Sequence, residues 1–160
     1  MTWQAGIDAV SFGGTKNGCM GVEAVVMFDP AHGRELALRR KRGGHLFSKH
    51  RYLSSQMVPY CDSGLWLEMA HSANARMAQL VQGLARVPAA RLAHPVAGNL
   101  AFIDVPRAAH IRAFAAGAQY YLFGGTPEDG PGDAALRCRI VCDWATTPED
   151  VDRLLTAWAG

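Results

Sequence analysis

A single lysine in a glycine-rich turn is the feature of this sequence that most favours chemistry. Lys16 directly follows a turn of small residues at the end of a short apolar stretch, within the segment DAVSFGGTKNG at residues 8–18. Glycines let the backbone approach a flat cofactor closely, and burial of a lysine lowers the pKa of its ammonium group, so that the neutral amine can attack an aldehyde. The segment is therefore a candidate for a lysine that forms a Schiff base.

Two other interpretations of this turn stay open on chemistry alone. The glycines could cradle a phosphate group, but GGTKNG lacks the GxxxxGK[ST] spacing of a P-loop. The lysine could also be a solvated side chain in an ordinary β-turn, because Lys-Asn-Gly is a common turn sequence. Without further information, the β-turn is the more frequent case.

Arginine side chains at a second place could bind an anion. Arg137 and Arg139 lie two residues apart on a predicted strand, so their side chains would face the same side. The guanidinium group is a planar fork of donors that matches a carboxylate. An arginine exposed to solvent on an edge strand is the alternative interpretation of either residue.

A basic cluster, the histidines and the cysteines complete the candidates. The run RRKR at residues 39–42 includes Lys41 and could be a localisation or nucleic-acid patch, but such a run is more often one solvated helix face. None of the six histidines has metal-ligand spacing with another, and the four cysteines form neither a CxxC pair nor a zinc array. The sequence therefore predicts no metal site, and its cysteines are expected to be small buried hydrophobes.

Hydrophobic periodicity predicts the elements that must position these residues. The clearest is a long helix at 63–86, whose apolar residues recur at intervals of three and four. A second clear helix starts near Thr147, which can cap it, with Pro148 at the first helical position and Asp150 completing a box-like cap. Other helices are predicted at 33–41, 46–59 and 106–116, and strands at 7–12, 21–29, 91–94, 99–105, 118–123 and 137–143.

The first two predicted strands are apolar on both faces. The run at 21–29 is almost continuously β-branched or aromatic, which is typical of a strand inside a parallel sheet. Yet no β–α units precede it, and an isolated pair of such strands is a poor sheet. We therefore expect the chain to begin in the middle of a domain.

The composition is that of an ordinary soluble globular protein, with 49% hydrophobic and 19% charged residues. A chain of 160 residues is long enough to bury a real core. The net charge of +2 is too small to favour nucleic acid or a membrane as a partner. No apolar run approaches the roughly 18 residues of a membrane span, and the start does not read as a secretory signal, so we expect a cytoplasmic protein.

The lysine motif and much of the remaining chain resemble one enzyme family. SFGGTKNG is very similar to the lysine motif of low-specificity L-threonine aldolases, in which alanine is usual at the position of Gly14. The likeness covers nearly all of the chain in the right order. It continues through VEAVVMFDP, RRKRGGHLFSKHRYLSSQ, GLWLEMAHSANA, HPVAGNLAF and RIVCDWATTPEDVDRLL.

This resemblance implies an α/β fold similar to that of aspartate aminotransferase. The chain would supply only the carboxyl-terminal portion of such a protein. Residues 1–62 would form the end of the large domain of a pyridoxal-phosphate (PLP) enzyme of fold type I, with the Schiff-base lysine. Residues 63–160 would form a connecting helix and the small carboxyl-terminal α/β domain.

The same resemblance implies a chemistry and a set of site residues. Members of the family use pyridoxal 5'-phosphate to cleave L-threonine and related β-hydroxy-α-amino acids to glycine and an aldehyde. Lys16 would be the Schiff-base lysine, with Thr15 beside it at the cofactor. Arg139 would bind the substrate carboxylate, with Arg137 as its rival, and Lys41 would lie near the anions of the active site. Active sites of the family form at subunit interfaces, which implies a homo-oligomer, a dimer or a tetramer.

Members of the family are considerably longer than this chain, and the resemblance leaves their amino-terminal half unmatched. We therefore expect cleavage only when that half is supplied, and an association with it. Two alternatives stay open. The chain could be a truncated, non-catalytic remnant, or it could belong to a PLP lyase that performs β-elimination or hydroxymethyl transfer, because fold and lysine motif do not separate these reactions.

Overall fold

A computed structural model describes residues 2–160 and divides the chain into two compact units. Unit 1 ends at Glu68 and unit 2 covers Met69–Gly160. The division falls within helix α4 (Leu65–Gly83), six residues after the division predicted between 62 and 63. Each unit is described separately below.

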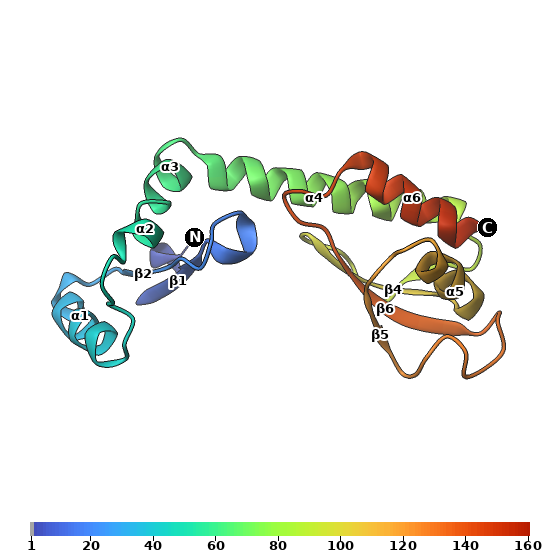
Figure 1. Cartoon of the computed structure of the whole chain (residues 1–160), viewed down its shortest axis with the longest axis horizontal. Coiled ribbons are helices and arrows are strands. Elements are labelled where there is room, and N and C mark those ends of the chain that lie inside the picture. Colours follow the sequence, from blue (N-terminus) through green and yellow to red (C-terminus); the bar gives the residue numbers. More distant parts are fainter. Residues whose placement is uncertain (1) are drawn as a thin grey trace. The chain divides into compact units, whose positions relative to one another are not determined.

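Unit 1 contains a two-stranded antiparallel sheet (Figure 1). Strand β1 (Ala9–Gly13) pairs with β2 (Glu23–Met27). The prediction of parallel strands buried on both faces is wrong, because the strands are antiparallel and Val25 and Val26 are 51% and 42% exposed. The connection between the strands is too short for the crossover that a parallel pair needs, so the chain turns back on itself.

Short helices make up the rest of unit 1. Helix α1 (Gly33–Arg42) matches the predicted helix, whereas the helix predicted at 46–59 is wrong. That stretch instead ends in two short helices, α2 (Arg51–Ser54) and α3 (Met57–Asp62). Lys49 has a φ of +64°, which a helix does not allow, so the helical path cannot start before it. Single 3-10 turns lie at η1 (Trp3–Ala5), η2 (Thr15–Asn17) and η3 (Pro30–His32).

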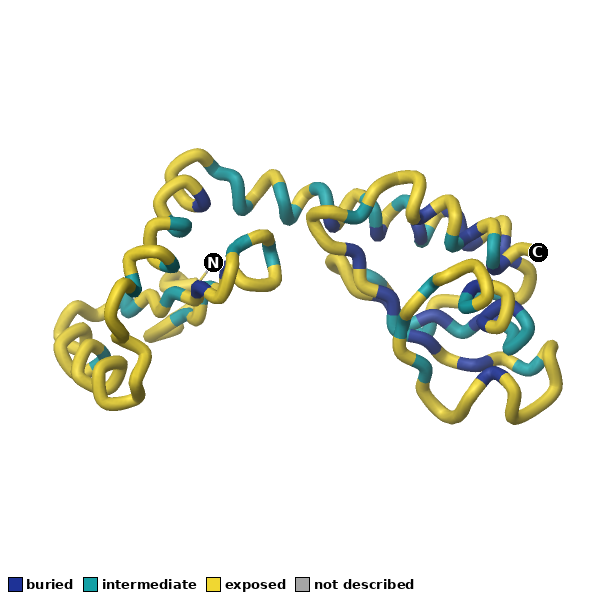
Figure 2. Tube along the Cα trace, in the orientation of Figure 1, coloured by how far each residue is buried: buried dark blue, intermediate teal, exposed yellow. Residues whose placement is uncertain are grey.

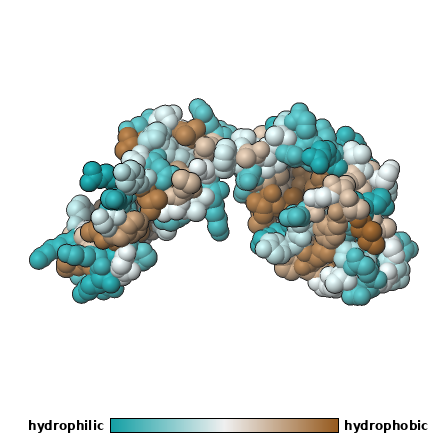
Figure 3. Space-filling model, in the orientation of Figure 1, coloured by the Kyte–Doolittle hydropathy of each residue, from teal (hydrophilic) through white to brown (hydrophobic). Residues whose placement is uncertain are grey.

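Unit 1 has almost no core. Among its described residues only Gly14, Val22 and Tyr60 are buried, so nearly all of its trace in Figure 2 is exposed or intermediate. Apolar side chains lie at the surface instead, and Figure 3 shows them among the polar ones. A segment of this size with so little buried apolar area does not supply enough stability to fold alone.

Unit 2 is an antiparallel sheet packed against helices. The strand order is β3-β4-β6-β5, with β3 (Arg91–Leu92), β4 (Leu100–Pro106), β5 (Tyr121–Phe123) and β6 (Ala135–Val141). These strands lie where four strands were predicted. Buried and less buried residues alternate along β4 and β6, as in a sheet with one covered face.

The covered face packs against α4, continued by the 3-10 turn η4 (Leu84–Arg86), and against α5 (Arg107–Ala115) and α6 (Pro148–Ala159) (Figure 1). The core includes Met77 and Leu80 from α4, Ile103 from β4 and Leu155 and Trp158 from α6. The predicted helices at 63–86 and 106–116 thus match the structure closely.

The predicted start of α6 is confirmed in detail. The Thr147 side chain accepts a hydrogen bond from the Asp150 backbone N–H, and the Asp150 carboxylate accepts one from the Thr147 backbone N–H, each at 3.1 Å. Pro148 occupies the first helical position. This reciprocal pair satisfies donors that a helix start leaves free.

A buried polar network joins the elements of unit 2. His110 Nδ1 lies 2.9 Å from the Tyr120 hydroxyl, and Nε2 lies 2.9 Å from the Leu136 carbonyl oxygen. The Leu136 carbonyl oxygen can only accept, so Nε2 carries a proton; the Tyr120 hydroxyl accepts from Trp158 Nε1–H at 3.0 Å and has its own proton to donate to Nδ1 of a neutral imidazole. Burial lowers the pKa of His110 and raises that of Tyr120.

The cysteines differ in burial. Cys138 and Cys142 are buried, as predicted, and burial raises the pKa values of their thiols to about 12 and about 11. The prediction is wrong for Cys61, which is exposed on α3, and Cys19 is half-buried. Within residues 2–160 no group of histidine, cysteine, aspartate or glutamate side chains could hold a metal ion. No helix among these residues has the length and apolar character needed to cross a membrane.

Candidate functional site

The backbone around Lys16 forms a tight hydrogen-bonded turn. The N–H of Gly14 donates to the carbonyl oxygen of Val22, and the N–H groups of Asn17 and Cys19 both donate to the carbonyl oxygen of Gly14, all at 3.0 Å. A Cβ atom at residue 14 would lie 3.0 Å from Cys19 Cβ and 3.1 Å from the Val22 carbonyl oxygen. Glycine therefore suits this position, where alanine is usual in the motif.

The side chain of Asn17 anchors the turn to the helices of unit 1. Its Nδ2 donates to the Tyr60 hydroxyl at 2.7 Å and to the Trp66 carbonyl oxygen at 3.0 Å. Phe12, which leads into the turn, packs edge-on against the Trp66 ring with centroids 5.4 Å apart. Sequence reasoning did not single out Asn17, because its partners lie 43 and 49 residues further along the chain.

Lys16 itself is exposed at the centre of this anchored turn. The expected burial of its side chain is wrong for the described residues, since unit 1 has too few buried residues to cover it. Within residues 2–160 Lys16 forms no ion pair, so no carboxylate of the described chain restrains its side chain. Thr15 beside it donates from its backbone N–H to the Glu23 carboxylate at 3.3 Å and from its hydroxyl to the Val22 carbonyl oxygen at 3.4 Å.

Lys41 lies on a solvated helix. Helix α1 buries none of its residues, and Glu35 on that helix pairs with Arg39 and Arg42 at 2.8 and 3.0 Å. Lys41 forms no ion pair among the residues that the structure describes. Its ammonium group is therefore free to meet an anion, which leaves both interpretations of the basic cluster open.

Arg139 lies near the middle of β6, in unit 2. Its Cα atom pairs with Phe102 of β4 on one side and with Tyr121 of β5 on the other. The guanidinium carbon lies 4.9 Å from the centroid of the Tyr121 ring. The Nε atom is buried and has no hydrogen-bond partner in the described part of the chain, so Arg139 retains a free donor.

Arg137, the rival of Arg139, is already engaged. It donates from Nε and Nη2 to the two carboxylate oxygens of Asp104, at 2.8 and 3.0 Å. This pairing lowers the pKa of Asp104. A second carboxylate would have to compete with Asp104 for the same donors, so Arg139 is the better candidate for binding one.

Comparison with known proteins adds to this geometry. No protein-family model matches the chain. It is 36% identical over 155 residues to a low specificity L-threonine aldolase of Pseudomonas sp. (strain NCIMB 10558) and 34% identical over 154 residues to one of Pseudomonas aeruginosa. Each match covers 96% of this chain. The predicted resemblance to low-specificity L-threonine aldolases is confirmed.

The threonine aldolases are longer than this chain, which spans only 42% of the length of these two relatives. A solved structure of threonine aldolase from Leishmania major matches with a TM-score of 0.77 and 26% identity, over 95% of this chain and 42% of the other. The chain therefore has the α/β fold of the carboxyl-terminal part of a threonine aldolase.

A more distant match agrees at the level of the fold alone. The α-aminoadipate aminotransferase LysN of Thermus thermophilus has a TM-score of 0.54 and 18% identity, over 98% of this chain and 43% of the other. That structure contains N-(5'-phosphopyridoxyl)-L-leucine. The aldolase fold of this chain is thus shared with an aminotransferase.

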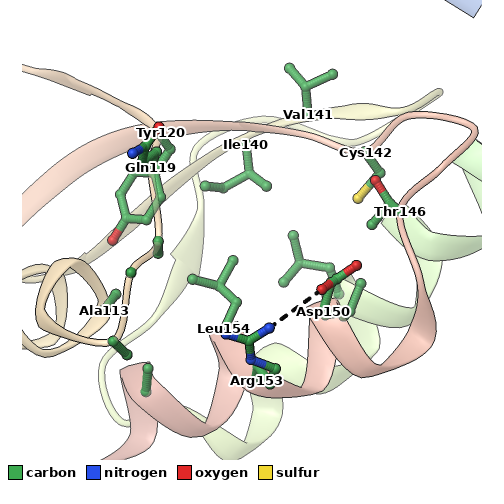
Figure 4. A pocket seen from close by; sticks show the side chains of 16 residues that line it. Ala113, Gln119, Tyr120, Ile140, Val141, Cys142, Thr146, Asp150, Arg153 and Leu154 are labelled. Atoms are coloured by element: carbon green, nitrogen blue, oxygen red, sulfur yellow. Dashed lines mark ion pairs between the residues drawn. The ribbon is translucent and has the colours of Figure 1, made fainter.

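A cavity of about 300 Å³ in unit 2 contains none of the predicted site residues (Figure 4). Leu80, Ala113, Ile140 and Leu154 give it apolar walls, with the ion pair of Asp150 and Arg153 among its lining. The Lys16 turn of unit 1 and the Arg139 strand of unit 2 are therefore two separate candidate positions, each described within its own unit.

Proposed function

We propose that this chain supplies the lysine-bearing part of an enzyme that cleaves L-threonine and related β-hydroxy-α-amino acids to glycine and an aldehyde with pyridoxal 5'-phosphate. The observation that carries the proposal is the Lys16 turn: an unpaired amine on a backbone anchored by Asn17, in a chain similar to threonine aldolases. Cleavage would require the remainder of the relatives' length, supplied by a second polypeptide or by a longer gene product.

The turn suits the attachment of a flat cofactor. Lys16 would hold pyridoxal phosphate covalently through its Nζ atom, and Thr15 would lie beside the bound cofactor. The exposed amine is free of ion pairs within residues 2–160, and the hydrogen bonds of Gly14 and Asn17 hold the backbone on either side of it. When bound, pyridoxal phosphate supplies a sink for the electron pair released as the Cα–Cβ bond breaks.

Arg139 would orient the substrate by binding its carboxylate. The free, buried Nε–H of Arg139 supports this role, because a buried donor without a partner costs free energy that a ligand acceptor would recover. The pairing of Arg137 with Asp104 supports Arg139 over its rival. Lys41 would contribute an accessory positive charge near the anionic groups of substrate or cofactor.

The exposed apolar side chains and small core of unit 1 support the requirement for a further polypeptide. Its described residues bury only three positions, and Val25 and Val26 present apolar side chains to solvent. The matched relatives contain more than twice the length that this chain spans. An association with the missing part, or with a second copy of the chain, would cover this surface.

Labelling of the lysines tests the proposal sharply. The chain has only three lysines, namely Lys16, Lys41 and Lys49. The purified chain would be mixed with pyridoxal phosphate and reduced with borohydride, and the pyridoxyl group located by peptide mapping. We expect labelling chiefly at Lys16, lost in Lys16→Ala and kept in the matched control Lys49→Ala. Equal labelling of all three lysines would contradict a preformed cofactor site and favour a non-catalytic remnant.

Product analysis separates the reactions. The chain would be combined with a polypeptide covering the amino-terminal part of a relative, and given L-threonine and pyridoxal phosphate. Glycine and acetaldehyde are the expected products. Release of ammonia instead would identify β-elimination and overturn the aldolase assignment.

A further inference from the structure

Arg139 has an aromatic neighbour that restrains it without using its hydrogen-bond donors. The guanidinium carbon lies 4.9 Å from the centroid of the Tyr121 ring, and the two residues are direct partners across β5 and β6. An arginine stacked on a ring face keeps its N–H groups free in the plane of the guanidinium. Arg137 differs, because Asp104 restrains it by accepting hydrogen bonds from two of its nitrogens.

The side chains of Tyr121 and Arg139 lie on the same face of the sheet. Tyr120, the residue before it, directs its hydroxyl to His110 and Trp158 on the covered side. Leu122, the residue after it, pairs with the buried Cys138. Since side chains alternate along a strand, Tyr121 must point to the opposite face.

Packing of the core does not explain this tyrosine. Its side chain is 68% exposed, so the ring contributes little to the buried apolar area of unit 2. The contact with Arg139 is the interaction that the structure gives to the ring. The ring therefore lies at the surface of the three-residue strand β5, where it contacts the guanidinium of Arg139.

We propose that Tyr121 is a positioning residue for Arg139, whose guanidinium it holds over its ring so that the buried Nε–H remains free to donate to a carboxylate. This inference rests on the proposed function, in which Arg139 binds the substrate carboxylate. Tyr121 acts through Arg139 and makes no contact with the reacting atoms.

Nitrogen NMR of the full chain tests the proposal. In a ¹⁵N-labelled sample the Arg139 Nε–H resonance is assigned by its loss in Arg139→Lys, and its exchange rate with water is measured. We expect slow exchange in the native chain and in Tyr121→Phe, which keeps the ring. Exchange should be several-fold faster in Tyr121→Leu, which removes the ring at similar size.

Titration with glycine adds a measure of carboxylate binding, with ethanolamine as the ligand that lacks the carboxylate. The glycine concentration at which the Arg139 resonance has moved half-way to its bound position should rise about threefold in Tyr121→Leu. A threefold change corresponds to the free energy of one exposed cation–π contact, which this variant loses. Phe123→Leu is the matched control. It removes an aromatic ring from the same strand and face and should leave both measurements unchanged.

The outcomes separate the two proposals. Unchanged exchange and unchanged glycine response in Tyr121→Leu would overturn the positioning role and leave the carboxylate role of Arg139 intact. Absence of any glycine response in the native chain, both alone and after pyridoxal phosphate and a polypeptide covering the amino-terminal part of a relative are added, would instead overturn the carboxylate role. Should Tyr121→Leu lose the dispersed spectrum of unit 2, Tyr121→Thr, with a β-branched residue suited to a strand, replaces it.

Discussion

Replacing Gly83 by alanine should destabilise unit 2, although alanine is the better helix former. Gly83 is the last residue of α4 and is buried against Leu155 of α6. A Cβ atom at this position would overlap Leu155 Cδ1, and it would lie 3.1 Å from Cδ2 of the same side chain. Leu155 is only 1% exposed and is packed in the core, so it has little room to move aside.

Two opposing effects set the magnitude. Alanine in place of glycine stabilises a helix by up to about 1 kcal/mol. Overpacking a tightly packed site costs about 1–3 kcal/mol. The steric cost should win, because the overlap is with a fully buried side chain. We therefore expect Gly83→Ala to lower the free energy of unfolding by about 1 kcal/mol, the difference between the middle of the second range and the first value.

Urea denaturation, followed by far-ultraviolet circular dichroism, would measure this change. Gly33→Ala is the matched control, because Gly33 has helical dihedral angles and a Cβ there would meet no atom within 4 Å. It should not be destabilising. The cost of Gly83→Ala should also shrink in the background of Leu155→Ala, with a coupling energy of about 0.5–3 kcal/mol. A Gly83→Ala chain as stable as the native one would refute the reasoning.

Two further predictions concern unit 2. Burial lowers the pKa of His110 below its ordinary 6.5, so in acid the native state binds fewer protons than the unfolded state. The contribution of the neutral imidazole to the free energy of unfolding should therefore be complete above about pH 6.5 and be lost as the pH falls through the native pKa. The urea midpoint of the native chain should fall between pH 7 and pH 5, and it should fall less in His110→Gln. An equal fall in the native chain and the variant would count against the buried neutral imidazole. Thr147→Ala should cost about 1 kcal/mol by removing the cap of α6, whereas Thr147→Ser should retain most of the stability in thermal unfolding. Equal melting temperatures for the two variants would contradict the cap.

Local signals in the sequence predicted the helices of unit 2 well. The cap of α6 depends on residues three apart, and the apolar stripe of α4 recurs within a single helix. The pairing of β1 with β2 was not predictable from the same signals. A run of β-branched residues shows that both faces are apolar, but it does not give the direction of the neighbouring strand.

The prediction of the candidate site residues depends on resemblance alone. The chemistry of the Lys16 turn by itself favoured an ordinary β-turn, and the extended match to one family reversed that preference. The hydrogen bonds of Asn17 and the contact of Tyr121 with Arg139 could not be predicted from the sequence, because in each case only the fold brings the partner residue near. Register across β5 and β6 decides which residue faces Arg139, and no local pattern specifies that register.

The unequal burial of the two units determines where the backbone opens first. Amides in β4 and β6 lie over a packed core and should exchange with solvent only when unit 2 unfolds, whereas those of β1 and β2 should exchange through frequent local opening. Lys16 thus lies in the part of the chain that is easiest to remodel, and Arg139 in the part that is hardest. A partner that orders unit 1 would therefore act on the turn that contains Lys16, whereas the strand that contains Arg139 is already ordered by the core of unit 2.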